Sequence, residues 1–100
     1  MWARVARYEV EPDRLDAAVQ GFENAAQGLA ALRGTRGGFL LGDRHEGAAV
    51  TITLWESYDS LCASEVAAAE LRRQAMGEAQ GSVASVALYE VAAEFGSSAS

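Results

Sequence analysis

The side chains best suited to bind a flat, oxygen-bearing molecule in this sequence are Arg4, Tyr8 and Trp55. Trp55 closes the apolar stretch TITLWES, where an indole could stack on a planar ring. Arg4 and Tyr8 would share one face of a β-strand, so a guanidinium could hold an anionic or phenolate oxygen and a hydroxyl could donate to the same ligand. Two plainer interpretations stay open. Trp55 could be a core residue that anchors the next helix, and Arg4 could reach solvent or a nearby glutamate from a strand end.

The charged composition narrows the possible chemistry. The net charge is −6 and the eight positive residues are scattered arginines, so binding to a nucleic-acid backbone is disfavoured. Lysine is absent, which excludes Schiff-base and P-loop chemistry. One cysteine, Cys62, excludes an intramolecular disulfide, and one histidine, His45, excludes a metal site with two or more histidines. A carboxylate metal site stays open without a motif to support it, and we expect neither a metal nor an organic cofactor.

The other polar residues are expected to have ordinary roles. His45 lies in the polar stretch DRHEG, as a solvated loop residue or as a base at a cavity entrance. Cys62 is expected to be a small apolar residue of a helix. Glu56 and Asp59 fit helix-start electrostatics. A solvated helix face is predicted for Glu65, Glu70, Arg72 and Arg73.

Hydrophobic periodicity predicts four strands and two helices in one domain, residues 1–95, followed by a flexible tail, residues 96–100. We expect strands over residues 2–10, 38–42, 48–56 and 82–95, and helices over about 12–33 and 57–79. A hairpin turn is expected over residues 43–47.

Local signals support the helix boundaries. Pro12 starts the first helix, Gly34 ends it, and Ser57 is expected to cap the second. Gly21 and Gly28 weaken the first helix and would permit close packing against the sheet.

This β-α-β-β-α-β order predicts an α+β fold of the ferredoxin-like type, with a four-stranded antiparallel sheet and both helices on one face. Both faces of the sheet would carry apolar side chains, and the two helices can cover only one, so a second copy packed sheet on sheet is the expected partner. No stretch is long and apolar enough to span a bilayer, and the N-terminus lacks the apolar core of a signal peptide. We therefore expect a cytoplasmic homodimer with no membrane or nucleic-acid partner.

The element order, the length and two stretches, ARYEVEPDRLDAAVQGFENAA and TITLWESYDSLCA, resemble the antibiotic biosynthesis monooxygenase family over about residues 2–94. This resemblance implies a dimeric α/β barrel with a pocket between helices and sheet. Members that act on aromatic polyketides oxidise a phenol to a quinone without metal or flavin, and other members bind and degrade haem. The tryptophan at the end of the family's strand matches Trp55.

The sequence departs from the family pattern at several positions. The haem-degrading members carry a histidine where Ser64 or Glu65 stands and an asparagine where Ala6 stands. The polyketide oxidases carry an asparagine where Thr51 stands and a tyrosine where Leu61 stands. The resemblance implies cofactor-independent oxygenation of a planar phenolic or polyketide-like molecule; the alternative is a non-catalytic dimeric module that binds a small ligand or assembles. The expected substrate-binding residues are Trp55, Arg4, Tyr8, Thr51, Thr53 and Phe22.

Overall fold

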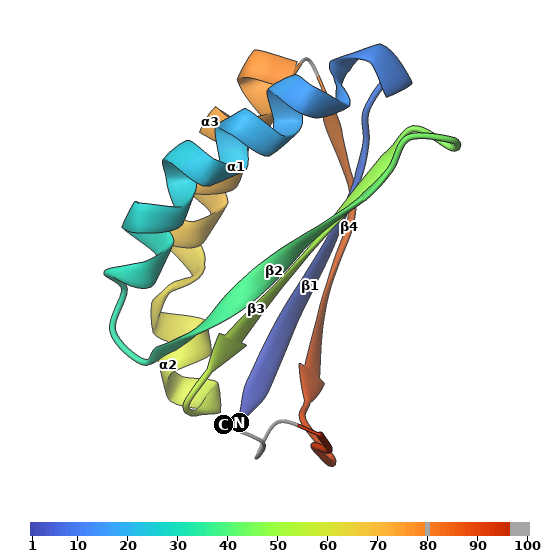
Figure 1. Ribbon diagram of the computed structural model, residues 1–100. Helices are drawn as coiled ribbons and strands as arrows, with labels where there is room; N and C mark the ends of the chain where they lie inside the picture. Colours follow the sequence, from blue (N-terminus) through green and yellow to red (C-terminus); the bar gives the residue numbers. More distant parts are fainter. Residues whose placement is uncertain (80, 97–100) are drawn as a thin grey trace.

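The structure, a computed structural model, describes residues 1–79 and 81–96. One four-stranded antiparallel sheet carries the helices on one face (Figure 1). The strands are Trp2–Glu9 (β1), Thr35–Asp43 (β2), Ala48–Trp55 (β3) and Ser82–Glu90 (β4). The helices are Leu15–Ala30 (α1), Tyr58–Ala63 (α2) and Glu65–Ala79 (α3). A short 3₁₀ turn, Pro12–Arg14 (η1), precedes α1. The strand order β2-β3-β1-β4 confirms the predicted ferredoxin-like arrangement.

The central strand β1 sets which side chains meet under the helices. In its pairing with β3, Arg4 lies opposite Thr53 and Ala6 lies opposite Thr51. Opposed residues of an antiparallel pair project to the same face of the sheet. Arg4, Ala6 and Thr51 are buried, which identifies this face as the one that the helices cover. β4 ends at Glu90, earlier than the sequence predicts, and residues 97–100 of the expected tail lie outside the described residues.

Helix α1 packs against both the sheet and α3. Its buried side chains, Leu15, Ala18, Phe22 and Ala25, recur at helical spacing and form the main core with β1 and β3. Gly21 faces α3: a Cβ there would lie 2.6 Å from the Ala75 carbonyl oxygen. The expectation that the α1 glycines pack on the sheet was therefore wrong, because they permit close approach of two helices instead.

The predicted second helix is two helices that meet at Ser64. Ser57 caps α2 as expected, since its Oγ accepts from the Ser60 backbone N–H at 3.1 Å. At Ser64 the backbone N–H bonds the carbonyls of Ser60 and Leu61, and its Oγ donates to the Leu61 carbonyl at 2.7 Å. A buried serine that bonds the preceding turn competes with regular helical hydrogen bonding, which accounts for the break.

The sheet face opposite the helices is apolar and exposed, as the sequence predicts. Phe39 is 64% exposed, Tyr89 56% and Leu41 50%. No helix within residues 1–79 and 81–96 covers this face (Figure 1). None of the described helices is long and apolar enough to cross a membrane.

Candidate functional site

An apolar groove of about 240 Å³ lies between α1 and the strands β2 and β3. Three of the predicted substrate-binding residues line it: Phe22 from α1, and Thr51 and Thr53 from β3. Leu29 of α1 and Leu40 of β2 supply apolar wall, and the exposed residues Gly37 and Gly38 form part of the rim. We call this space the α1 groove. Its apolar walls and few hydroxyl groups are typical of a small-molecule site.

A small space of about 10 Å³, which we call the inner end of the α1 groove, lies next to the groove on the side of α3. It shares Phe22, Leu29, Thr51 and Thr53 with the groove and adds Arg4, Ala68 and Arg72. The apolar groove therefore ends at two guanidinium groups.

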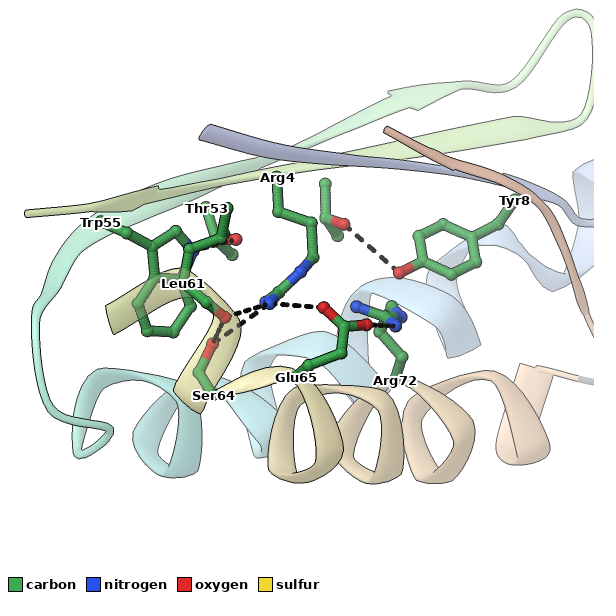
Figure 2. A network of polar contacts seen from close by, with 9 residues as sticks. Arg4, Tyr8, Thr53, Trp55, Leu61, Ser64, Glu65 and Arg72 are labelled. Atoms are coloured by element: carbon green, nitrogen blue, oxygen red, sulfur yellow. Dashed lines mark hydrogen bonds and ion pairs between the residues drawn. The ribbon is translucent and has the colours of Figure 1, made fainter. Parts of the chain in front are cut away.

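Arg4 is almost fully buried, with 2% of the residue exposed, although it carries a charge. Its Nη2 donates to three acceptors: the Leu61 carbonyl at 3.0 Å, Ser64 Oγ at 3.1 Å and Glu65 Oε2 at 2.9 Å (Figure 2). Its Nε and Nη1 are buried and have no hydrogen-bond partner among the described residues. Arg4 thus reaches a glutamate, as one sequence interpretation proposes, but from the interior rather than from an exposed strand end.

The charges around Arg4 do not balance. Glu65 also contacts Arg72, whose Nη2 lies 3.5 Å from Glu65 Oε1. Burial lowers the pKa of Arg4 from its usual value, while the neighbouring Glu65 carboxylate acts against this shift. An arginine stays protonated near neutral pH all the same. Two positive groups therefore share one carboxylate, which leaves the cluster with a net positive charge.

Tyr8 lies beside the same inner end but contacts the groove through a second hydroxyl. The Tyr8 hydroxyl and Thr51 Oγ1 are 3.3 Å apart, and the Tyr8 ring packs on Phe22 with centroids separated by 5.2 Å. Burial raises the pKa of Tyr8 above its usual value, so the phenol stays neutral and can donate.

Trp55 is completely buried and lies beside Thr53 and Arg4 (Figure 2). Its Nε1 donates to Thr53 Oγ1 at 3.0 Å, and the Arg4 guanidinium carbon lies 5.3 Å from the centre of its ring. The indole therefore fixes Thr53 and supports Arg4, while its stacking on a ligand stays a prediction.

The structure corrects the predicted solvated face of the last helix. The Arg72 side chain is only 11% exposed and that of Glu65 47%, and both point toward the sheet (Figure 2). Their spacing from Leu61 and Ala68 follows one helical face, which is the sequence signal that could have identified them. The other half of that expectation holds, since Glu70 and Arg73 form an exposed ion pair.

Of the remaining candidates, His45 lies away from this cluster, whereas Cys62 directly follows Leu61 and lines a surface hollow together with Glu65. His45 is exposed in the turn between β2 and β3, and Cys62 is exposed on α2. Within residues 1–79 and 81–96, no group of three acidic, histidine or cysteine residues is placed to hold a metal ion.

No protein-family model matches the sequence, and no curated protein sequence is significantly similar to it. The fold, in contrast, is similar to many solved structures. The cofactor-independent oxygenase SnoaB from Streptomyces nogalater is 18% identical, with a TM-score of 0.70 over 94% of this chain and 95% of that one. The heme-degrader MhuD from Mycobacterium tuberculosis, solved with two hemes bound in its active site, is 21% identical, with a TM-score of 0.73 over 96% and 100%.

A structure of an antibiotic biosynthesis monooxygenase is 16% identical, with a TM-score of 0.66 over 93% of this chain and all of that one. Identities this low establish the architecture and leave the chemistry to the residues of the site. The chain has the fold shared by the antibiotic biosynthesis monooxygenases, as the sequence resemblance implies.

Proposed function

We propose that this protein is a cofactor-independent monooxygenase of the antibiotic biosynthesis type, which acts on a planar phenolic or polyketide-like molecule. The observation that carries this proposal is the α1 groove, an apolar slot that ends at Arg4, Thr51 and Arg72. Such a slot fits a flat ring system whose polar edge is inserted first. The fold shared with the oxygenase SnoaB adds support.

The proposed reaction converts a phenol to a quinone with dioxygen. An electron passes from the electron-rich phenolate to O₂, and the radical pair recombines at the ring carbon. One oxygen atom becomes the new carbonyl and the second leaves as water, with the hydrogens lost from the phenol hydroxyl and that ring carbon. In this scheme the arginines favour the phenolate, and the apolar walls exclude water and orient the ring.

The competing function is a non-catalytic dimeric module that binds a small ligand. Thr51 and Leu61 stand where the resemblance expects an asparagine and a tyrosine, and this observation favours the alternative. Degradation of haem has less support, because Ser64 and Glu65 stand at the position of the family's histidine and both are bonded to Arg4.

Oxygen uptake measured with a hydroxyanthrone, such as dithranol, distinguishes the proposed monooxygenase from the non-catalytic binding module. An oxygenase should consume one O₂ for each quinone formed, at a rate above the spontaneous oxidation. Phe22→Trp, which fills the groove, should abolish this excess, whereas the exposed Phe95→Trp should retain it. Equal rates with and without protein, in the presence of demonstrated ligand binding, would favour the module.

We also propose that two copies pack through the exposed sheet face. Phe39, Leu41 and Tyr89 lie on this face, and the same patch on a second copy is the simplest complementary surface. Sedimentation at several concentrations should give a dimer for the native chain and a monomer for Phe39→Glu. Val66→Glu on α3 is a matched control, because Val66 is exposed on the other side of the molecule. A native chain that sediments as a monomer at all concentrations would refute this assembly.

A further inference from the structure

The buried guanidinium of Arg4 keeps most of its hydrogen-bonding capacity unused. A guanidinium has five N–H donors, and the two on Nη2 serve all three acceptors that Arg4 has. The N–H groups of Nε and Nη1 remain, buried and without a partner among the described residues. Buried donors of this kind are costly and uncommon unless another molecule satisfies them.

The surrounding charges point to the sign of that molecule. Arg4 and Arg72 share Glu65, so the cluster lacks one negative charge. Tyr8 adds no negative charge because burial keeps its phenol neutral. A single anionic group would balance the charge of the cluster and accept at least one of the unused hydrogen bonds.

The shape of the site limits how large the anionic group can be. Arg4 and Arg72 border an inner space of about 10 Å³, which is the size of one water molecule. This space shares four lining residues with the α1 groove, whose walls are apolar. A ligand that places one oxygen at the inner end must therefore carry a flat apolar body behind it.

We propose that the inner end of the α1 groove is a receptor for one ionised oxygen group, carboxylate or phenolate, carried by a flat aromatic ligand. The oxygen accepts a hydrogen bond from one of the unpartnered Arg4 nitrogens, Nε or Nη1, and Arg72 supplies the second positive charge. This inference deepens the proposed function, because it assigns the ligand of the same groove a charge of minus one. It rests on the groove as a ligand site, and it holds for enzyme and binding module alike.

Calorimetric titration with 2-naphthoate and its neutral analogue 2-naphthamide tests the receptor. Near neutral pH the carboxylate should bind about 10- to 100-fold more tightly than the amide, as expected for charge-assisted hydrogen bonds to a buried arginine. Arg4→Met should remove this difference. Arg72→Leu should reduce it and serves as a second variant should Arg4→Met fail to fold.

Glu65→Gln distinguishes an anion receptor from a purely structural cluster of ion pairs. Glutamine can still accept from Arg4 Nη2, but the carboxylate charge is lost, so 2-naphthoate should bind several-fold more tightly while 2-naphthamide is unaffected. Glu70→Gln is the matched control: it removes the same charge from the exposed side of α3 and should change neither affinity. Weaker binding of 2-naphthoate to Glu65→Gln would overturn the proposal.

A weakly acidic phenol, 6-cyano-2-naphthol, separates the two oxygen sources. If the receptor takes phenolates, binding near neutral pH releases a proton, which titrations in buffers of different ionisation enthalpy detect. Binding without proton release, together with tight binding of 2-naphthoate, assigns the receptor to carboxylates. Equal affinity for naphthoate and naphthamide, or binding of neither, overturns the proposal. If the protein binds 2-naphthoate more tightly than 2-naphthamide but does not increase oxygen uptake, only the proposed oxygenase activity is refuted.

Discussion

Replacing Arg4 with methionine should leave the protein as stable as before, or more stable by up to about 2 kcal/mol, although it removes a buried ion pair. Methionine is unbranched and apolar like the stem of arginine, ends near the position of Nε and has no polar hydrogen, so it fills the space of that stem. A structural salt bridge would predict the opposite, a loss of several kcal/mol.

The interactions of Arg4 determine the expected size of the change. The substitution removes one ion pair to Glu65, which is half exposed and therefore worth at most about 1 kcal/mol. It also removes bonds to Leu61 and Ser64, about 1 kcal/mol each. These two partners stay satisfied, because Ser64 Oγ still donates to the Leu61 carbonyl.

The gain comes from the two unpartnered nitrogens of Arg4, whose burial costs about 1–3 kcal/mol for each. The contact with the Trp55 ring is largely kept, since a methionine sulfur replaces the cation. Losses and gains therefore nearly cancel, with a small excess on the side of the gain.

Urea denaturation followed by tryptophan fluorescence, at fixed protein concentration, measures the change. Arg73→Met is the matched control, since Arg73 is exposed on the same helix as Arg72, and its curve should overlay that of the native chain. A loss of more than about 3 kcal/mol for Arg4→Met would mean that Nε and Nη1 are satisfied in solution. The case for an anion receptor would then lose its main support.

Four further substitutions test the packing, the titration and the helix capping of the fold. Gly21→Ala should destabilise the protein by about 1–2 kcal/mol in the same urea assay, because the new Cβ would meet the Ala75 carbonyl. Gly77→Ala should stabilise it by up to about 1 kcal/mol, because the space around Gly77 is open. Burial raises the pKa of Tyr8, so the folded state holds the phenol proton more tightly than the unfolded state. The free energy of unfolding should therefore fall as the pH rises above about 10. Urea denaturation repeated across that pH range should show a smaller fall for Tyr8→Phe. Ser57→Ala should cost about 1 kcal/mol, seen as a lower urea midpoint, because α2 loses its N-cap; an unchanged midpoint would show that the cap contributes nothing.

The strands and the topology could be predicted from the sequence because their signals are local. Alternation of side chains placed Arg4 and Tyr8 on one face of β1, and that face is the one that the helices cover. The same alternation predicted an apolar face that the helices leave uncovered, and the structure places Phe39 and Tyr89 on it.

The sequence predicted only the Arg4 side of the ion-pair cluster of Arg4, Glu65 and Arg72, because the positions of Glu65 and Arg72 depend on tertiary packing. Arg72 and Glu65 carry charges, which favours a solvated position when the helix is considered alone. Both side chains nevertheless turn toward the sheet, where Arg4 of β1 pairs with Glu65, and a sequence pattern on one helix contains no information about that partner. The sequence did not predict the helix break at Ser64 either, because the alanine-rich residues on both sides favour an uninterrupted helix.

The helix break and the candidate site depend on the same side chain. A helix leaves its last carbonyls without intrahelical partners and with partial negative charge, so α2 needs donors at its C-terminus. Arg4 reaches that terminus from the central strand, where Nη2 bonds Leu61 and Ser64 (Figure 2). Nη2 of the guanidinium therefore closes α2 and orients the group, while Nε and Nη1 remain without partners among the described residues and Arg4 borders the inner end of the groove. Because the fold itself holds Arg4 in place, the unpaired donors persist without a ligand, and a ligand that meets them need not reorganise the protein.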